Sequence, residues 1–188
     1  MKKLDLWRDP WPLDEAQCPC DVHLTRWLRE QGLSGQRIFH FGTGDHHHVG
    51  LQAPGSGHSV LGITATEAEY SSYIRLVVEN PDLGRQYKVM FGDIYQTNLA
   101  LLPEFDLVTL FHLGEFWSAN NAPFAALDDR GLMEGMAKKI VPGGRMAFFT
   151  GSFAYDVAER LIPAVLPPLG FTEEAGSRSL RLFRRAEG

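Results

Sequence analysis

Cysteine is scarce in this chain of 188 residues, and its two cysteines, Cys18 and Cys20, are separated by a single proline. A pair this close in sequence cannot cross-link distant parts of a fold, so a disulfide scaffold is excluded and reduced thiols are expected. No apolar run approaches the ~20 residues of a membrane-spanning helix, and the first residues lack the apolar core of a signal peptide. We therefore expect a cytoplasmic protein with no membrane partner.

Basic residues are also few, with 18 lysines and arginines against 23 acidic residues and a net charge of −5. This sign does not suit a domain that binds a phosphate backbone, so nucleic acid is not expected as a partner. Four arginines near the C-terminus alternate with apolar residues, which predicts a strand with one solvated face rather than a nucleic-acid site: Arg178, Arg181, Arg184 and Arg185.

Three common ligand-binding motifs are missing. Gly42-Thr43-Gly44 does not continue as a dinucleotide fingerprint, because His47 stands where that motif needs its third glycine. No GKS or GKT sequence follows these glycines, and no GxSxG sequence follows a predicted strand. Nicotinamide dinucleotide binding is disfavoured, and nucleoside triphosphate and serine-hydrolase chemistry are excluded.

What is present is the composition of an ordinary globular domain, with 44% hydrophobic and 22% charged residues. Residues 1–20 hold three prolines and two tryptophans without a period, which predicts an irregular N-terminal arm, followed by one domain over 21–188. Asp21 is predicted to cap a helix that ends near Gly32.

Short β-type runs then alternate with helical stretches. Strands are predicted at 38–41, 59–63, 87–91, 105–111 and 145–150, with helices at 66–79, 124–139 and 156–165. Two further runs, 171–174 and 179–183, are close enough to pair as a hairpin. The pattern predicts an α/β fold: a single Rossmann-like, doubly wound sheet, mostly parallel, with an antiparallel C-terminal hairpin.

Ligands of such sheets bind at the carboxyl ends of the strands. Polar or glycine-containing turns follow four of the predicted strands at this edge: Gly42-Thr43-Gly44, then Thr64, then Gly92-Asp93-Ile94, then His112-Leu113-Gly114-Glu115. A glycine turn lets a ligand approach the backbone, and Asp93 can accept hydrogen bonds from an amino group.

Five segments in this order resemble the class I S-adenosylmethionine-dependent methyltransferases: 37–44, 59–64, 92–94, 105–108 and 140–145. The resemblance spans roughly residues 24 to 184. It implies S-adenosylmethionine as cofactor, a small-molecule methyl acceptor, and cofactor contacts from the first and third turns: His40, Gly42, Thr43, Gly44, Asp93 and Ile94.

The chain departs from that family at three positions. His40 stands where an acidic residue is usual, His46 replaces the third glycine, and Thr64 replaces the acidic residue that ends the second strand. The segment 62–69 resembles that of cyclopropane fatty acid synthases, in which this threonine is normal and a glutamine stands at the position of Glu69. This resemblance adds Thr64 and Glu69 to the expected cofactor site.

Histidine is the compositional oddity, because five of the seven histidines fall within residues 40–58. One hypothesis is a transition-metal site with ligands drawn from His46 and His48, together with His40 or His112. The other is that the loop histidines are solvated. Cys18, Cys20 and His23 are also closely spaced, but they form an incomplete ligand set and are interpreted as accidental.

The leading hypothesis is methyl transfer. His112 is the candidate base, because the ordinary pKa of histidine lies near neutrality, and Glu115 is the second candidate. Trp7 and Trp11 of the arm are candidates for a lid. The alternatives are a metal-binding protein or metal-dependent enzyme on a degenerate methyltransferase scaffold, and a non-catalytic subunit. The oligomeric state is left open.

Overall fold

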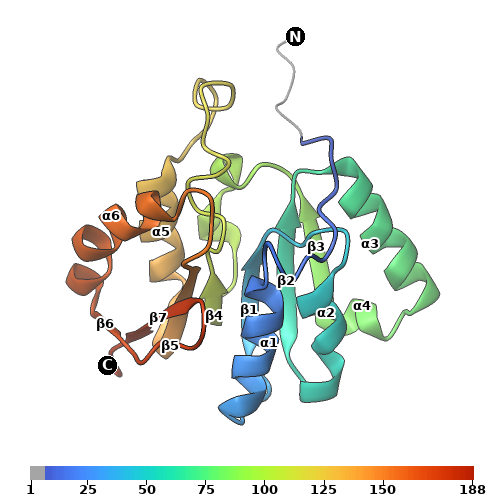
Figure 1. The fold of residues 1–188 in the computed structure, drawn as a ribbon, viewed down its shortest axis with the longest axis horizontal. Coiled ribbons are helices and arrows are strands. Elements are labelled where there is room, and N and C mark those ends of the chain that lie inside the picture. Colours follow the sequence, from blue (N-terminus) through green and yellow to red (C-terminus); the bar gives the residue numbers. More distant parts are fainter. Residues whose placement is uncertain (1–6) are drawn as a thin grey trace.

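The computed structural model describes residues 7–188, and its central element is one seven-stranded sheet (Figure 1). The strands are β1 (Arg37–Phe41), β2 (Ser59–Thr64), β3 (Tyr87–Phe91), β4 (Phe105–Thr109), β5 (Ile140–Phe149), β6 (Phe171–Glu173) and β7 (Leu180–Arg185). Their order is β3-β2-β1-β4-β5-β7-β6. Strands β1 to β5 pair in parallel, and β7 is antiparallel to both β5 and β6. The predicted fold class is confirmed.

Helices cover both faces of this sheet. They are α1 (Cys20–Glu30), α2 (His48–Gln52), α3 (Glu67–Glu79), α4 (Leu83–Gln86), α5 (Asp129–Lys138) and α6 (Tyr155–Val165). Figure 1 shows α1 and α2 in front of the central strands, with α5 and α6 beside β4 and β5. Within residues 7–188, no helix is both long enough and apolar enough to cross a membrane.

The sheet separates two hydrophobic cores because successive side chains of a strand point to opposite faces. In β1, Phe39 and Phe41 join a core that includes Leu132 of α5 and Ile162 of α6. Ile38 joins the other core, which holds side chains of α1, α2 and α3, such as Leu24, Val49 and Tyr73. We name these the α5–α6 face and the α1–α2 face.

The first crossover is short, since α2 has five residues. His47, immediately before it, has a φ of 46°, a left-handed conformation that glycine adopts most readily. The dinucleotide fingerprint has its third glycine at this place. The backbone therefore keeps a glycine-like turn although the residue is histidine.

Several predicted boundaries are wrong, among them the end of β4, which lies at Thr109 and not at 111. Helix α1 begins at Cys20, so Asp21 lies in its first turn, where the buried carboxylate faces His40 instead of capping the helix. Helix α5 begins at Asp129, not at 124, because the Asp128 side chain caps it by accepting from the Gly131 N–H, and the N–H groups of residues 126 and 127 donate to the carbonyl of Tyr95.

Strand β5 starts five residues before the predicted 145 and includes the predicted turn Pro142-Gly143-Gly144. The ladder between β4 and β5 has a register shift between Phe105 and Leu107, which accommodates these residues. The predicted strand is present as β7, but it buries side chains on both faces, with Leu182 in one core and Phe183 in the other. Arg181 pairs with Glu173, and Arg178 lies before the strand.

Candidate functional site

A cavity of about 630 Å³ lies at the carboxyl edge of the sheet, within the size range of small-molecule sites. The turns after β1, β2, β3 and β4 all contribute to its lining, as the sequence predicts for that edge. The predicted site residues that line it are Gly42, Gly44, His46, Thr64, Glu69, Ile94, His112 and Glu115. The cavity lining does not include His40, Thr43, His48 or Asp93.

The glycine turn brings backbone to the cavity wall. Gly42 and Gly44 have φ values of +85° and +56°, which side chains adopt rarely. A Cβ atom at Gly44 would lie 2.5 Å from Nε2 of His46 and 2.9 Å from the carbonyl oxygen of Trp11. The side chain of Thr43 is buried and faces Gly62 of β2, so it supports the turn from behind.

A carboxylate stands at the end of β2, although it comes from α3. The Thr64 hydroxyl donates to Oε2 of Glu69 at 2.6 Å, and the backbone N–H of Trp11 donates to Oε1 at 3.0 Å. Burial raises the pKa of Glu69, although these two hydrogen bonds oppose the rise. The Thr64–Glu69 pair thus supplies the acidic group that the β2 end itself lacks.

Asp93 caps the 3₁₀ turn Ile94–Gln96. Its carboxylate accepts from the Tyr95 N–H at 2.9 Å, from Nδ2 of Asn121 at 3.1 Å and from Nε2 of Gln96 at 3.3 Å. These contacts fix the loop after β3 and the segment after β4 relative to each other. Ile94 is the residue of this turn that reaches the cavity.

His40 lies beneath the site, on the α1–α2 face. Its side chain is buried, with Nδ1 2.9 Å from the Thr109 hydroxyl and Nε2 3.3 Å from Oδ2 of Asp21. Burial acts to raise the pKa of Asp21, but the histidines around it, His40 first and His46 next, hold it below its usual value. His40 is therefore part of a buried polar pair.

His46 and His48, in the segment after β1, point to different parts of the structure. His46 borders the cavity with Nδ1 3.9 Å from Asp21, whereas Nε2 of His48 lies 3.0 Å from the hydroxyl of Thr25 on α1. Across residues 7–188, neither belongs to a group of three potential metal ligands. The metal hypothesis based on His46 and His48 thus has no geometric support.

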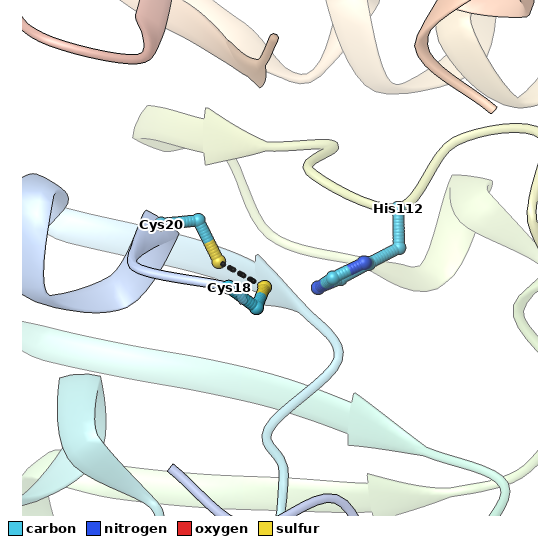
Figure 2. Close-up of side chains that lie close together, drawn as sticks. All are labelled: Cys18, Cys20 and His112. Carbon is cyan, nitrogen blue, oxygen red and sulfur yellow. Dashed lines mark hydrogen bonds between the residues drawn. The ribbon is translucent and has the colours of Figure 1, made fainter. Parts of the chain in front are cut away.

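A different cluster is present, and it contains the two cysteines that the sequence interpretation, grouping them with His23, dismissed. The ligand atoms of Cys18, Cys20 and His112 all lie within 4.8 Å of one another, and the two sulfur atoms are 3.3 Å apart. Figure 2 shows the imidazole of His112 pointing toward Cys18 from the turn after β4. His23 instead contacts Ser179, with Nδ1 2.6 Å from the hydroxyl. The spacing Cys-X-Cys was the available signal, but the third member lies more than ninety residues away in the sequence.

Glu115 holds the ring of His112. Its Oε2 is 3.2 Å from Nδ1, and its Oε1 accepts from the Ser152 hydroxyl at 2.5 Å and from the Phe153 N–H at 3.1 Å. Nδ1 is therefore the protonated nitrogen of the ring, and Nε2 is the nitrogen left for another partner. Both residues line the cavity.

The charges of this cluster are coupled. Burial acts to lower the pKa of His112, but interactions with Cys18 and Glu115 raise it to about 10. Hydrogen bonding from Cys20, opposed by burial and assisted by His112, lowers the pKa of Cys18 to about 5. The two groups therefore stabilise each other's charged form, a cationic His112 ring beside an anionic Cys18 sulfur.

The arm forms one edge of the cavity. Trp7 packs edge-on against Phe116 with ring centroids 4.8 Å apart and bridges to Thr66. The Trp11 carbonyl accepts from the Asp45 N–H at 2.8 Å, so the arm is attached to the glycine turn as well as to α3. Both tryptophans line the cavity and stay about 40% exposed, at 44% and 40%.

No protein-family model matches the sequence, and no curated protein matches it either. Solved structures do share its fold. The N-methyltransferase NodS of Bradyrhizobium japonicum WM9, in complex with S-adenosylhomocysteine, is 16% identical with a TM-score of 0.61, over 94% of this chain and 89% of that one.

Two further structures are similar. The magnesium protoporphyrin IX methyltransferase ChlM of Synechocystis PCC 6803, with bound S-adenosylmethionine, is 16% identical with a TM-score of 0.62, over 89% of this chain and 79% of that one. The [4+2]-cyclase SpnF is 17% identical with a TM-score of 0.58, over 92% and 65%. At these identities the likeness establishes architecture: the chain has the fold of the S-adenosylmethionine-dependent methyltransferases.

Proposed function

We propose that the protein transfers a methyl group from S-adenosylmethionine to a small-molecule acceptor. The observation that carries the proposal is the cavity itself, in which a backbone turn at Gly42 and Gly44, the Thr64–Glu69 pair and Ile94 meet at the carboxyl edge of the sheet. Similar structures with this fold contain S-adenosylmethionine or its demethylated product.

The proposed cofactor contacts follow the resemblance and the geometry together. The glycine turn receives the cofactor closely because no side chain intervenes. The carboxylate of Glu69 offers acceptor oxygens for hydroxyl groups, and Ile94 offers apolar contact for an aromatic base. Asp93 is proposed to act mainly by holding that turn, because, unlike Glu69, it does not line the cavity, and its oxygens accept from the protein. His40 and Thr43 support the site from outside the cavity.

The acceptor is proposed to lie beside His112 and Glu115, the candidate catalytic residues, under the arm that carries Trp7 and Trp11. Methyl transfer from a sulfonium is a direct displacement, so catalysis requires alignment of the acceptor with the methyl group and removal of the acceptor's proton. Glu115 aligns the ring of His112, whose Nε2 faces the two sulfur atoms.

Calorimetric titration with S-adenosylmethionine and S-adenosylhomocysteine tests the cofactor. We expect both to bind, and we expect Gly44→Val to abolish binding because its side chain would clash with His46 and with the Trp11 carbonyl. Gly55→Ala is the matched control, since a Cβ atom there has no neighbour within 4 Å. Failure of the unmodified protein to bind either compound at millimolar concentration contradicts the proposal.

Transfer itself needs a second assay, because one similar structure is a cyclase. Protein that binds the cofactor is incubated with methyl-labelled S-adenosylmethionine and a panel of small acceptors. We expect label in a small product, and we expect His112→Ala to lower turnover about 10²–10⁴-fold with little change in cofactor affinity. Cofactor binding without transfer to any acceptor of the panel favours the non-catalytic alternative.

A further inference from the structure

We propose that Cys18, Cys20 and His112 bind one zinc-class metal ion, with three protein ligands and a fourth coordination position open to the cavity. Metal sites with three protein ligands keep that position for water or substrate. The inference goes beyond the proposed function. It uses none of the proposed cofactor contacts, and it makes His112 a metal ligand instead of a base.

The distances fit a tetrahedral ion. With zinc–sulfur bonds of about 2.3 Å and a zinc–nitrogen bond of about 2.0 Å, tetrahedral angles separate two sulfur ligands by about 3.8 Å and a sulfur from a nitrogen by about 3.5 Å. The two sulfur atoms of the chain are 3.3 Å apart, and all three ligand atoms lie within 4.8 Å. Small side-chain rotations therefore suffice to close the site around an ion.

The histidine is already oriented for this purpose. Metal-binding imidazoles usually donate their second N–H to a carboxylate, which fixes the tautomer and the ring direction. Glu115 accepts from Nδ1 of His112 at 3.2 Å and is itself held by the Ser152 hydroxyl and the Phe153 N–H. This leaves Nε2 as the ligand nitrogen, on the side of the ring that faces Cys18 (Figure 2).

The two sulfurs come from a segment fixed at both sides. Cys20 is buried and is the first residue of α1, while the Cys18 N–H donates to the Asp14 carbonyl at 2.7 Å. Pro19 lies between them with a φ of −78°, so the backbone that sets their separation is restrained. Both cysteines and His112 line the cavity, so an ion bound there has access to its contents.

Ligand chemistry selects the class of ion. Two thiolates and one imidazole are soft to borderline ligands, which favour zinc or copper over magnesium, calcium or manganese. Two thiolates also neutralise a divalent cation, so the buried site carries no net charge from ion and ligands. Of the clusters formed by residues 7–188, this is the one with three potential ligand atoms in reach.

The experiment uses full-length protein without a histidine tag. Protein is expressed with added zinc, desalted and analysed for metal, and the cobalt(II)-substituted form is examined for thiolate-to-metal charge-transfer absorption. We expect about one metal ion per chain. Cys18→Ser, Cys20→Ser and His112→Gln are each expected to lower metal content at least tenfold, with His46→Gln and His23→Gln as matched controls that retain it.

Circular dichroism and thermal unfolding identify any variant that fails to fold, and for such a variant zinc competition against a chromophoric chelator on the unmodified protein decides instead. The inference is overturned by substoichiometric metal with no zinc affinity in that competition, by equal metal content in all variants, or by a Cys18–Cys20 disulfide in protein prepared under reducing conditions. Titration of zinc-free protein with S-adenosylhomocysteine separates metal binding from cofactor binding, since either can fail while the other holds.

Discussion

The two faces of the sheet bury different kinds of side chain. The α5–α6 face is filled by apolar side chains, among them Phe39, Phe148 and Met133, each with no exposed surface. The α1–α2 face buries polar groups as well, with His40 between Asp21 and Thr109, and His47 against the Tyr87 hydroxyl.

The two faces therefore contribute to the stability of the fold in different ways. An apolar face contributes by burial alone, in proportion to the area removed from water. A buried polar group is costly unless it is hydrogen-bonded, so it restricts the structure to arrangements that satisfy it. The α1–α2 face also carries Cys20 at the start of α1, next to the cavity. Both cores reach the cavity, however, since Phe41, Ile63 and Ile94 of the α5–α6 face also line it.

Truncation on the α5–α6 face is expected to have the largest effect. Phe148→Ala should lower the free energy of unfolding by about 3–5 kcal/mol, because the fully buried ring leaves a cavity among well-packed neighbours. Urea denaturation measures the change. Leu101→Ala is the control, since that side chain is 82% exposed and its loss should change stability by less than about 0.5 kcal/mol. A small loss for Phe148→Ala would show that this face is loosely packed.

On the α1–α2 face, we expect acid to lower the free energy of unfolding through the protonation of His47. Burial lowers the pKa of His47 to about 4 from an ordinary value of 6.5. As pH falls, His47 is protonated in the unfolded chain before it is protonated in the folded protein. The contribution of His47 to the free energy of unfolding is therefore complete above about pH 6.5 and is lost as pH falls toward 4. The loss should reach up to about 3 kcal/mol.

The measurement compares unfolding at pH 7 and pH 4.5 in the unmodified protein and in His47→Asn, which tolerates the left-handed backbone of this position. The asparagine variant should show the smaller decrease. Equal decreases would mean that other groups, such as His46 or His58, dominate the acid response of this face.

The buried hydrogen bond between His40 and Thr109 should contribute less than the aromatic core. Thr109→Val keeps the shape of the side chain but leaves Nδ1 of His40 without its partner at 2.9 Å, which should cost about 1–2 kcal/mol. Thermal unfolding of Thr109→Val beside Thr109→Ser tests it, because serine retains the hydroxyl. If valine is as stable as threonine, the polar groups of this face do not depend on that contact.

The smallest effect is expected outside both cores. Arg37 at the start of β1 pairs with Asp106 at 3.0 Å, and the Arg37 side chain is 49% exposed. Solvent screens such a pair, so Arg37→Ala should lower stability by less than about 1 kcal/mol. Thermal unfolding in low and high salt measures it. A larger loss would mean that this edge of the sheet contributes more than its exposure indicates.

The sequence predicts the fold well because hydrophobic periodicity and glycine turns are local signals. The runs over β2 and β3 and the helix α6 lie within a residue of their predicted ends, and the four turns meet at one cavity. The start of α5 is missed because the preceding residues bond to the Tyr95 carbonyl, and that partner lies about thirty residues upstream.

The site is predicted less well because its contacts join distant segments. Glu69 and Thr64 are close in sequence, and the resemblance places both at the expected cofactor site, although it does not predict the hydrogen bond between them. By contrast, Cys18 meets His112 through the packing of the arm on the turn after β4, and the same packing gives Asp21 a histidine partner. No spacing rule contains these pairs, so the residue types alone could not assign them.

The arm connects the entrance of the cavity with the sulfur cluster mechanically. Trp11 is hydrogen-bonded at the entrance of the cavity, and Cys18, seven residues later in the same segment, lies beside His112. Between them, the Asp14 side chain accepts from the N–H groups of Ala16 and Gln17 and forms a compact turn. A displacement of Trp11 away from the cavity would therefore displace the Cys18 sulfur as well, unless this turn changes its conformation. The stiffness of residues 14–17 thus determines whether ligand entry changes the geometry of the cluster.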